Sequence, residues 1–158
     1  MAYLLDVPSL NNIETQKFVH DTSAERTLSN TSVDDIDGSE ISYTCASSAS
    51  NIIYECTLHL WASPDVNNTY NIELYEDAGS GYPSSGLGDY YRVYASATRL
   101  LYRTLLNIRF VLPTYTGSRS YKLRVRSNGT GSEASITKRD GTTTTDIYVP
   151  VVQMYSII

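Results

Sequence analysis

Alternation of side chains between residues 51 and 61 is the feature that most constrains the fold of this chain. Every second side chain is apolar, while the positions between them mix polar and apolar types, which is the pattern of a half-buried β-strand. One face holds Ile52, Tyr54, Cys56, Leu58 and Leu60, and the other holds Ile53, Glu55, Thr57, His59 and Trp61. The segment therefore predicts a strand with one face in a core.

The same period of two recurs in several later segments and favours an all-β chain. No long amphipathic helix and no repeat of fixed length is predicted. The side chains expected to point inward are Ile41, Tyr43, Cys45, Tyr70, Ile72, Leu74, Leu106, Ile108, Phe110, Leu112, Tyr121, Leu123 and Val125, with a short strand at Ala134 and Ile136. The spacing predicts an antiparallel β-sandwich of about eight strands.

Residues 147–158 contain no charged side chain. Such a segment aggregates if it is exposed, so we expect it to be buried in the fold or in an oligomer. Pro150 has no N–H to give to a sheet, which predicts a bulge or a sheet edge at that point.

Residues 1–32 differ from the rest because their apolar residues follow neither the period of two of a strand nor the period of 3.6 of a helix. The 158-residue chain has the length of one domain. We predict an extended N-terminal arm over residues 1–32, with one short strand near residues 15–21, and a sandwich domain over residues 33–158.

Charge is low and unevenly distributed along the chain. Charged residues make up 18% of the sequence; residues 1–89 hold 14 of the 17 acids, and residues 90–158 hold 10 of the 12 bases. We expect cross-strand pairs, such as Glu73 or Glu55 opposite an arginine, and keep a polyanion-binding face as the alternative. The bases form no compact cluster with stacking aromatic residues, so we expect no nucleic-acid partner.

The first residues, the apolar runs and the two cysteines indicate the cellular compartment of the protein. No apolar run approaches the ~20 residues that span a bilayer, so we expect no membrane segment. The first residues carry no positive charge and therefore do not resemble a secretory signal. Cys45 and Cys56 are interpreted as two small core residues, or as a cross-strand disulfide if residues 50–51 turn a hairpin.

Signatures of catalysis are missing from the sequence. Histidine occurs as His20 and His59, and no Gly-x-Ser-x-Gly elbow supplies a nucleophile. The cysteines and histidines lack zinc-ligand spacing, and the acidic residues 34–40 do not follow a calcium loop. We expect no enzyme activity, no cofactor and no metal; a cytosolic hydrolase is the competing class, which an esterase and glycosidase screen tests.

Residues 77–89 include four glycines and a proline. Loops of this length inside a compact domain are often functional. The segment is either a solvated connection or a contact loop that presents Tyr82, Tyr90 and Tyr91.

Three phrases resemble a pattern in small virion proteins of tailed bacteriophages whose domain is a tumour-necrosis-factor-like jelly roll. They are Asp-Gly-Ser-Glu-Ile-Ser-Tyr-Thr at 37–44, Ala-Ser-Asn-Ile-Ile-Tyr-Glu at 49–55 and Asp-Ile-Tyr-Val-Pro-Val-Val-Gln-Met-Tyr at 146–155. The resemblance covers residues 33–158 and implies a homotrimer around an apolar and aromatic threefold axis. The residues it assigns to the core or trimer strand are Tyr148, Val149, Val151, Met154 and Tyr155.

Two functions compete within that group. A capsid cement or decoration protein clamps the phage head by binding the major capsid protein, with arm contacts expected at Tyr3, Leu4, Leu5, Phe18 and Val19. A head-fibre or tail-fibre module recognises a host surface glycan, here through the loop tyrosines. The short arm has no shaft repeat, which favours decoration. Either role places the protein in the virion after synthesis in the host cytoplasm.

Overall fold

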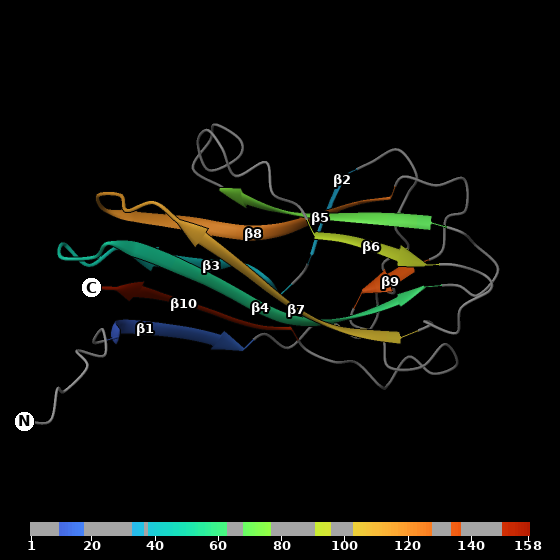
Figure 1. Cartoon of the computed structure of the whole chain (residues 1–158), viewed down its shortest axis with the longest axis horizontal. Coiled ribbons are helices and arrows are strands. Elements are labelled where there is room, and N and C mark those ends of the chain that lie inside the picture. The colour runs from blue at the N-terminus through green and yellow to red at the C-terminus, as the bar shows by residue number, and fades with distance from the viewer. Residues whose placement is uncertain are drawn as a thin grey trace, which may run out of the picture.

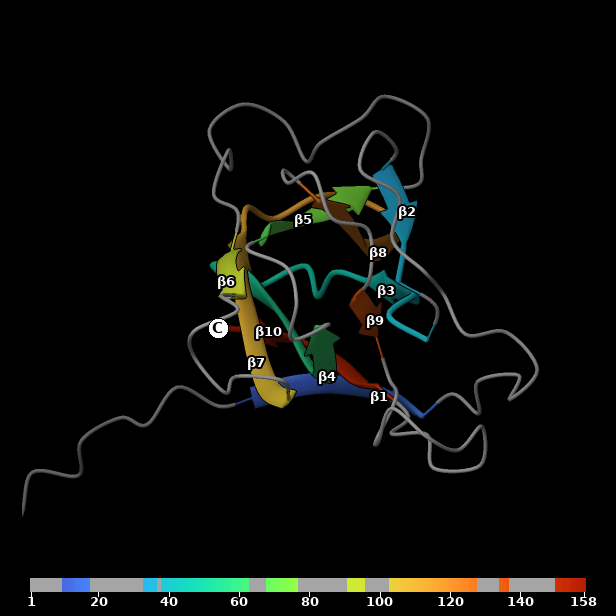
Figure 2. The same ribbon diagram turned by 90° about the vertical axis from the view of Figure 1, so that its right-hand side faces the viewer.

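A computed structural model describes residues 10–17, 33–36, 38–62, 68–76, 91–95, 103–127, 134–136 and 150–158. Every regular element in these segments is a β-strand, and no helix among them is long and apolar enough to cross a membrane. The strands form two antiparallel sheets that lie as separate layers (Figure 1, Figure 2). This confirms the predicted all-β sandwich.

Five strands make up each sheet. The first sheet contains β1 (Leu10–Lys17), β10 (Val151–Ile157), β4 (Asn51–Ala62) and β7 (Arg103–Leu112) in that order, with β9 (Ala134–Ile136) also paired to β4. The second contains β2 (Val33–Asp35) and β3 (Ile41–Thr44), which both pair with β8 (Ser118–Ser127), followed by β5 (Asn68–Glu76) and β6 (Tyr91–Ala95).

The connectivity is that of a jelly roll. From β1 the chain passes to β2 and β3 in the second sheet, returns for β4, crosses again for β5 and β6, and then alternates through β7 and β8 before it ends in the first sheet. The first strand therefore lies beside the last one. Such a double-sheet arrangement buries one face of each sheet against the other.

The core contains most of the side chains that period two predicted to point inward, and Cys45 and Leu106 pack against it partly buried. In β4, for example, Ile52, Tyr54, Cys56 and Leu58 are at most 1% exposed. Phe110 on β7 meets Tyr54 edge to face, with ring centroids 6.4 Å apart. Both sheets contribute to the cluster: Ile36, Ile41, Tyr43, Ile52, Tyr54, Cys56, Leu58, Tyr70, Ile72, Leu74, Ile108, Phe110, Leu112, Tyr121, Leu123, Val125, Val152 and Met154.

A kink separates β2 from β3 along the edge of β8. Gly38 has a φ of 79°, a value that favours glycine. The side chain of the buried Ser39 then takes the place of a backbone acceptor for β8. Its Oγ accepts a hydrogen bond from the N–H of Leu123 at 2.9 Å and donates one to the carbonyl of Ile36 at 2.5 Å. From the other sheet, the Tyr54 hydroxyl donates to the Ser39 carbonyl at 2.6 Å.

Part of the segment predicted as the N-terminal arm is paired to the sandwich. Residues 10–17 form β1, which pairs antiparallel with β10, so the sandwich includes a strand upstream of residue 33. β1 overlaps the short strand predicted near residues 15–21 at residues 15–17 and begins at Leu10. Its register shifts between Asn11 and Ile13. A bulge of this kind interrupts period two, which explains why the sequence pattern did not predict the first part of the strand.

The cysteines are both free, so the disulfide alternative is wrong. β3 and β4 belong to different sheets, and the turn at residues 50–51 therefore does not form a hairpin that sets Cys45 across from Cys56. Cys56 is in the core, and burial raises the pKa of its thiol to about 12. A thiol in that environment is unreactive.

Candidate functional site

The outer face of the first sheet, on β10, β4 and β7, is the most unusual surface among the described residues. Side chains directly opposite one another in an antiparallel pair share a face, so the register assigns this surface. We call it the β10-β4-β7 face; it consists of Val151, Gln153, Tyr155, Ile53, Glu55, Thr57, His59, Leu105, Asn107, Arg109 and Val111.

Apolar side chains are exposed on this face. The large hydrophobic residues classed as exposed in the described part of the chain are Leu105 at 61%, Val111 at 49% and Val151 at 41%, and all three belong to it. Ile53 lies between Tyr155 and Val111 in the ladder and is buried, although it points away from the core.

A polar row crosses the middle of the β10-β4-β7 face. The register aligns Gln153, Glu55 and Arg109 on three neighbouring strands. Glu55 Oε1 lies 3.3 Å from Arg109 Nε and accepts the Tyr155 hydroxyl at 3.0 Å, while Oε2 accepts Gln153 Nε2 at 2.5 Å. This confirms the expected pairing of Glu55 with an arginine.

Two groups on this face have shifted pKa values. Burial and the neighbouring Glu55 carboxylate raise the pKa of Tyr155, so its hydroxyl remains a proton donor across the physiological range. Partial burial lowers the pKa of His59, which is opposite Leu105 in the register. The neutral imidazole is therefore favoured at this position.

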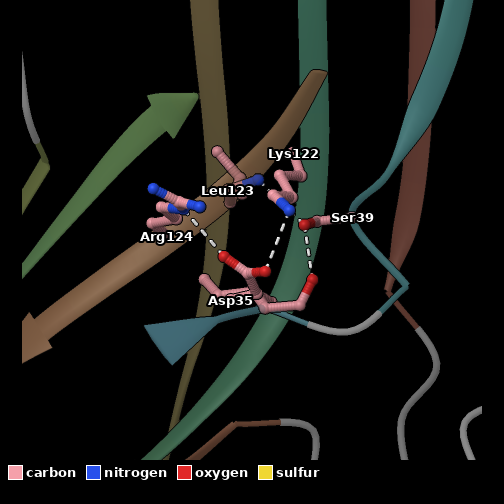
Figure 3. Close-up of polar contacts among 6 residues, drawn as sticks. Asp35, Ser39, Lys122, Leu123 and Arg124 are labelled. Carbon is pink, nitrogen blue, oxygen red and sulfur yellow. Dashed lines mark hydrogen bonds and ion pairs between the residues drawn. The ribbon is translucent and has the colours of Figure 1, made fainter. Parts of the chain in front are cut away.

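The outer face of the second sheet is instead charged and internally paired (Figure 3). Asp35 on β2 contacts Lys122 Nζ at 2.9 Å and Arg124 Nε at 2.8 Å, both on β8. The Arg124 guanidinium also lies over the Tyr75 ring, with Cζ 3.4 Å from the centroid. Glu73 faces Arg124 in the register, as the sequence predicted.

A second charged contact ties the end of β5 to the start of β8. Arg119 Nη1 lies 3.0 Å from Glu76 Oε1 and 3.2 Å from its other oxygen. The guanidinium also covers the Tyr115 ring at 4.7 Å, and Tyr115 packs beside Tyr121. These partners compensate the charges within the chain, with the Glu76 side chain largely buried and the Arg119 side chain partly exposed.

Only part of the residues singled out in the sequence lies in the described structure. Met154 is in the core, Val151 is exposed on the β10-β4-β7 face, and Tyr155 binds Glu55 there. Tyr91 is the first residue of β6. The predicted residues outside the described segments are Tyr3, Leu4, Leu5, Phe18, Val19, Tyr82, Tyr90, Tyr148 and Val149.

Sequence reasoning placed Arg109 and Val111 on the outer face of their strand but missed that they form one surface with Leu105 and Val151. The available signal was the presence of apolar residues on both faces of β7, whereas a strand with one solvated face alternates.

The described residues contain no group of three or more His, Cys, Asp or Glu side chains arranged to hold a metal ion. What the arrangement provides is a shape for packing: apolar side chains on either side of a hydrogen-bonded polar row.

No protein-family model matches this sequence, and no curated protein matches it. Among solved structures, a chain from the structure of infectious bursal disease virus, Gx strain, is similar, with a TM-score of 0.48 and 14% identity. The match covers 93% of this chain and 36% of that chain, so this chain spans little more than a third of the viral chain. A likeness at this TM-score carries no argument about function.

Proposed function

We propose that this protein is a noncatalytic structural protein of a virion, which forms a trimer through the β10-β4-β7 face and clamps a phage head as a cement protein. The observation that carries the proposal is the position of the exposed apolar residues. Leu105, Val111 and Val151 all lie on one outer sheet face, while the outer face of the other sheet carries paired charges.

Burial of that face in an assembly has a clear driving force. Each fully covered Leu or Val side chain contributes about 1.5–3 kcal/mol relative to leaving it in water. Closed rotational symmetry satisfies such a face without leaving it open to further copies. The resemblance to phage virion modules is what favours three copies as the closed form.

Capsid binding is assigned to the apolar residues beside β1. Tyr3, Leu4 and Leu5 precede this strand in the sequence, and Phe18 and Val19 follow it. β1 itself is paired to β10, so both apolar groups are tethered to the sandwich by a strand of eight residues. Contacts made by such tethered segments with the major capsid protein would bridge neighbouring subunits of the shell.

The self-association is tested with a double variant, Leu105→Lys with Val111→Lys. The expected wild-type mass in light scattering is three times 17.6 kDa, and the variant is expected to be a folded monomer because two charges per chain oppose burial of the face. The matched control, Thr44→Lys with Thr114→Lys, adds the same charge at exposed positions outside the β10-β4-β7 face. It should keep the wild-type mass. A wild-type monomer at all concentrations contradicts the proposal.

The capsid role is tested by replacing Tyr3, Leu4 and Leu5 with Ser while β1 is retained. Cosedimentation with capsids that lack the protein should be lost, and the native mass should not change. A control that replaces Asn11 and Asn12, polar residues at the bulge, with Ser should bind as wild type. If the variant at Tyr3, Leu4 and Leu5 binds capsids fully, and virions that carry it adsorb to host cells as wild type does, the assigned contacts are contradicted.

A further inference from the structure

The first strand is attached to the sandwich through a single neighbour. β1 pairs antiparallel with β10 along its whole length, from Leu10 opposite Ile157 to Lys17 opposite Val151. No other strand of the described residues pairs with it (Figure 1). β1 is therefore held by one ladder, whereas β10 is held by β1 on one side and by β4 on the other.

This ladder is separable from the rest of the sheet. Its register shifts between Asn11 and Ile13, which interrupts the pairing near the start of the strand. Detachment of β1 breaks the one ladder that it makes and leaves the pairing of β10 with β4 intact.

The edge of β10 that β1 covers needs an occupant. The sequence of β10, Val-Val-Gln-Met-Tyr-Ser-Ile, contains neither a charged residue nor a proline. An uncharged edge of this kind pairs readily with a further strand. The strand whose length and register fit this edge is β1, and every copy of the chain carries one.

The connection after β1 is long enough to place this strand on another copy. Residues 18–32 join β1 to β2, and a fully extended segment of this length reaches about 50 Å. A compact domain of 158 residues has a radius of gyration of about 15 Å, which corresponds to a diameter of about 40 Å. The connection can therefore span from one sandwich to the β10 edge of an adjacent one.

We infer that β1 is exchanged between copies, so that β1 of one copy pairs with β10 of the next in the register seen within the chain. Exchange of an identical element remakes the contacts that it breaks, which makes it a low-cost route to an oligomer. In a closed ring each chain gives one strand and receives one, and no β10 edge is left open. The inference goes beyond the proposed function, because it requires copies to associate but not through the β10-β4-β7 face.

Paired cysteines test the exchange in the full chain. Thr15 is opposite Gln153 in the register of β1 and β10. After oxidation, the variant Thr15→Cys with Gln153→Cys should run mostly as covalent oligomers in denaturing electrophoresis without reductant. The matched control is Ser42→Cys with Ser120→Cys, at opposed hydroxyls of β3 and β8. Its disulfide should close within one chain and leave a covalent monomer.

The wild-type chain gives a second test if the cysteine variant does not fold or oxidise. Isotope-labelled and unlabelled chains are unfolded, mixed and refolded together, and isotope-filtered nuclear magnetic resonance then detects contacts between copies. Gln16 is opposite Val152 in the register, so a contact between these two residues should appear between labelled and unlabelled chains. Such a contact within one copy only overturns the inference.

Each remaining outcome also decides the matter. An internal disulfide between positions 15 and 153 in a native oligomer overturns the inference and leaves the proposed function standing. Covalent oligomers of the Ser42 and Ser120 control overturn it too, because random oxidation would then explain the links. Interchain disulfides that persist when Leu105→Lys and Val111→Lys are added support the exchange and contradict association through the β10-β4-β7 face. A wild type that is monomeric at every concentration overturns both proposals.

Discussion

Ser39 accepts a hydrogen bond from the backbone of Leu123 at the point where the edge of the second sheet changes strands. The Oγ atom is 2.9 Å from the Leu123 nitrogen, and both residues are buried. Because β2 pairs with residues 124–126 of β8 and β3 with residues 118–121, Leu123 lies between the two pairings. The Ser39 hydroxyl therefore replaces the backbone carbonyl that a paired strand would offer to the Leu123 N–H (Figure 3).

Replacing Ser39 with Ala should lower the free energy of unfolding by about 1–3 kcal/mol, because the Leu123 N–H is left buried without its acceptor. Urea unfolding monitored by circular dichroism measures the difference. Ser42→Ala is the matched control, since the Ser42 hydroxyl pairs with Ser120 at 2.7 Å on an exposed surface. It should change stability by less than about 0.5 kcal/mol.

Asp35 should make the protein sensitive to acid. Burial raises the pKa of this carboxyl, but hydrogen bonds and charges from Lys122 and Arg124 outweigh that effect and place it below its ordinary value of 3.8. A lowered carboxyl pKa means that stability is fully present above pH 3.8 and is lost as the pH falls through the folded-state value.

Asp35→Asn should therefore cost up to about 1 kcal/mol at pH 7, as a partly exposed ion pair does. The cost should shrink as the pH falls below 3.8. Unfolding midpoints at pH 7, 5 and 3 test this. A similar loss for the exposed Glu40→Gln at pH 7 would argue against a specific role of Asp35.

His59 should make stability fall on mild acidification. Partial burial lowers its pKa from the ordinary 6.5, so the folded state favours the neutral ring. The unfolded chain takes up the proton first, and stability is lost as the pH falls below 6.5. In His59→Gln the unfolding midpoint should change less between pH 7.5 and 5.5 than in wild type. His20→Gln, at the other histidine, should retain the wild-type pH dependence.

β1 should protect the edge of β10. A chain that starts at residue 18 lacks this strand and exposes one backbone edge of β10, whose sequence Val-Val-Gln-Met-Tyr-Ser-Ile has no charge. We expect its melting temperature to fall by several degrees, at roughly 2–4 °C per kcal/mol for a domain of this size. Aggregation on heating should follow.

A chain that starts at residue 10 retains β1 and is the control for this truncation. It should unfold at the wild-type temperature without aggregation. Equal melting temperatures for the two truncated chains would show that the pairing of β1 with β10 contributes nothing to stability.

Much of the fold followed from local pattern. The period of two identified the inward residues of β3, β4, β5, β7 and β8, because a half-buried strand must alternate. It also gave the pairing of Glu55 with an arginine. The pattern was less informative at β1, where a bulge breaks the period, and it did not predict that Ile53 is buried although the register places it on an outer face.

The candidate site was the less predictable part. Leu105 and Val111 lie on β7 and Val151 lies on β10, two strands that are distant in sequence. No local pattern shows that β10 and β7 are the two neighbours of β4 in one sheet. A strand pattern tells which side chains share a face of that strand. It does not tell which strands are neighbours.

The sequence by itself determined the fold class, the inward face of most strands and the low density of charge, because these depend on neighbours along the chain. Only the tertiary structure decided that the two cysteines are not bonded, that residues 10–17 belong to the sandwich, and that three exposed apolar residues share one sheet face with Glu55. Those features depend on the order and register of strands, which long-range packing of both sheets selects together.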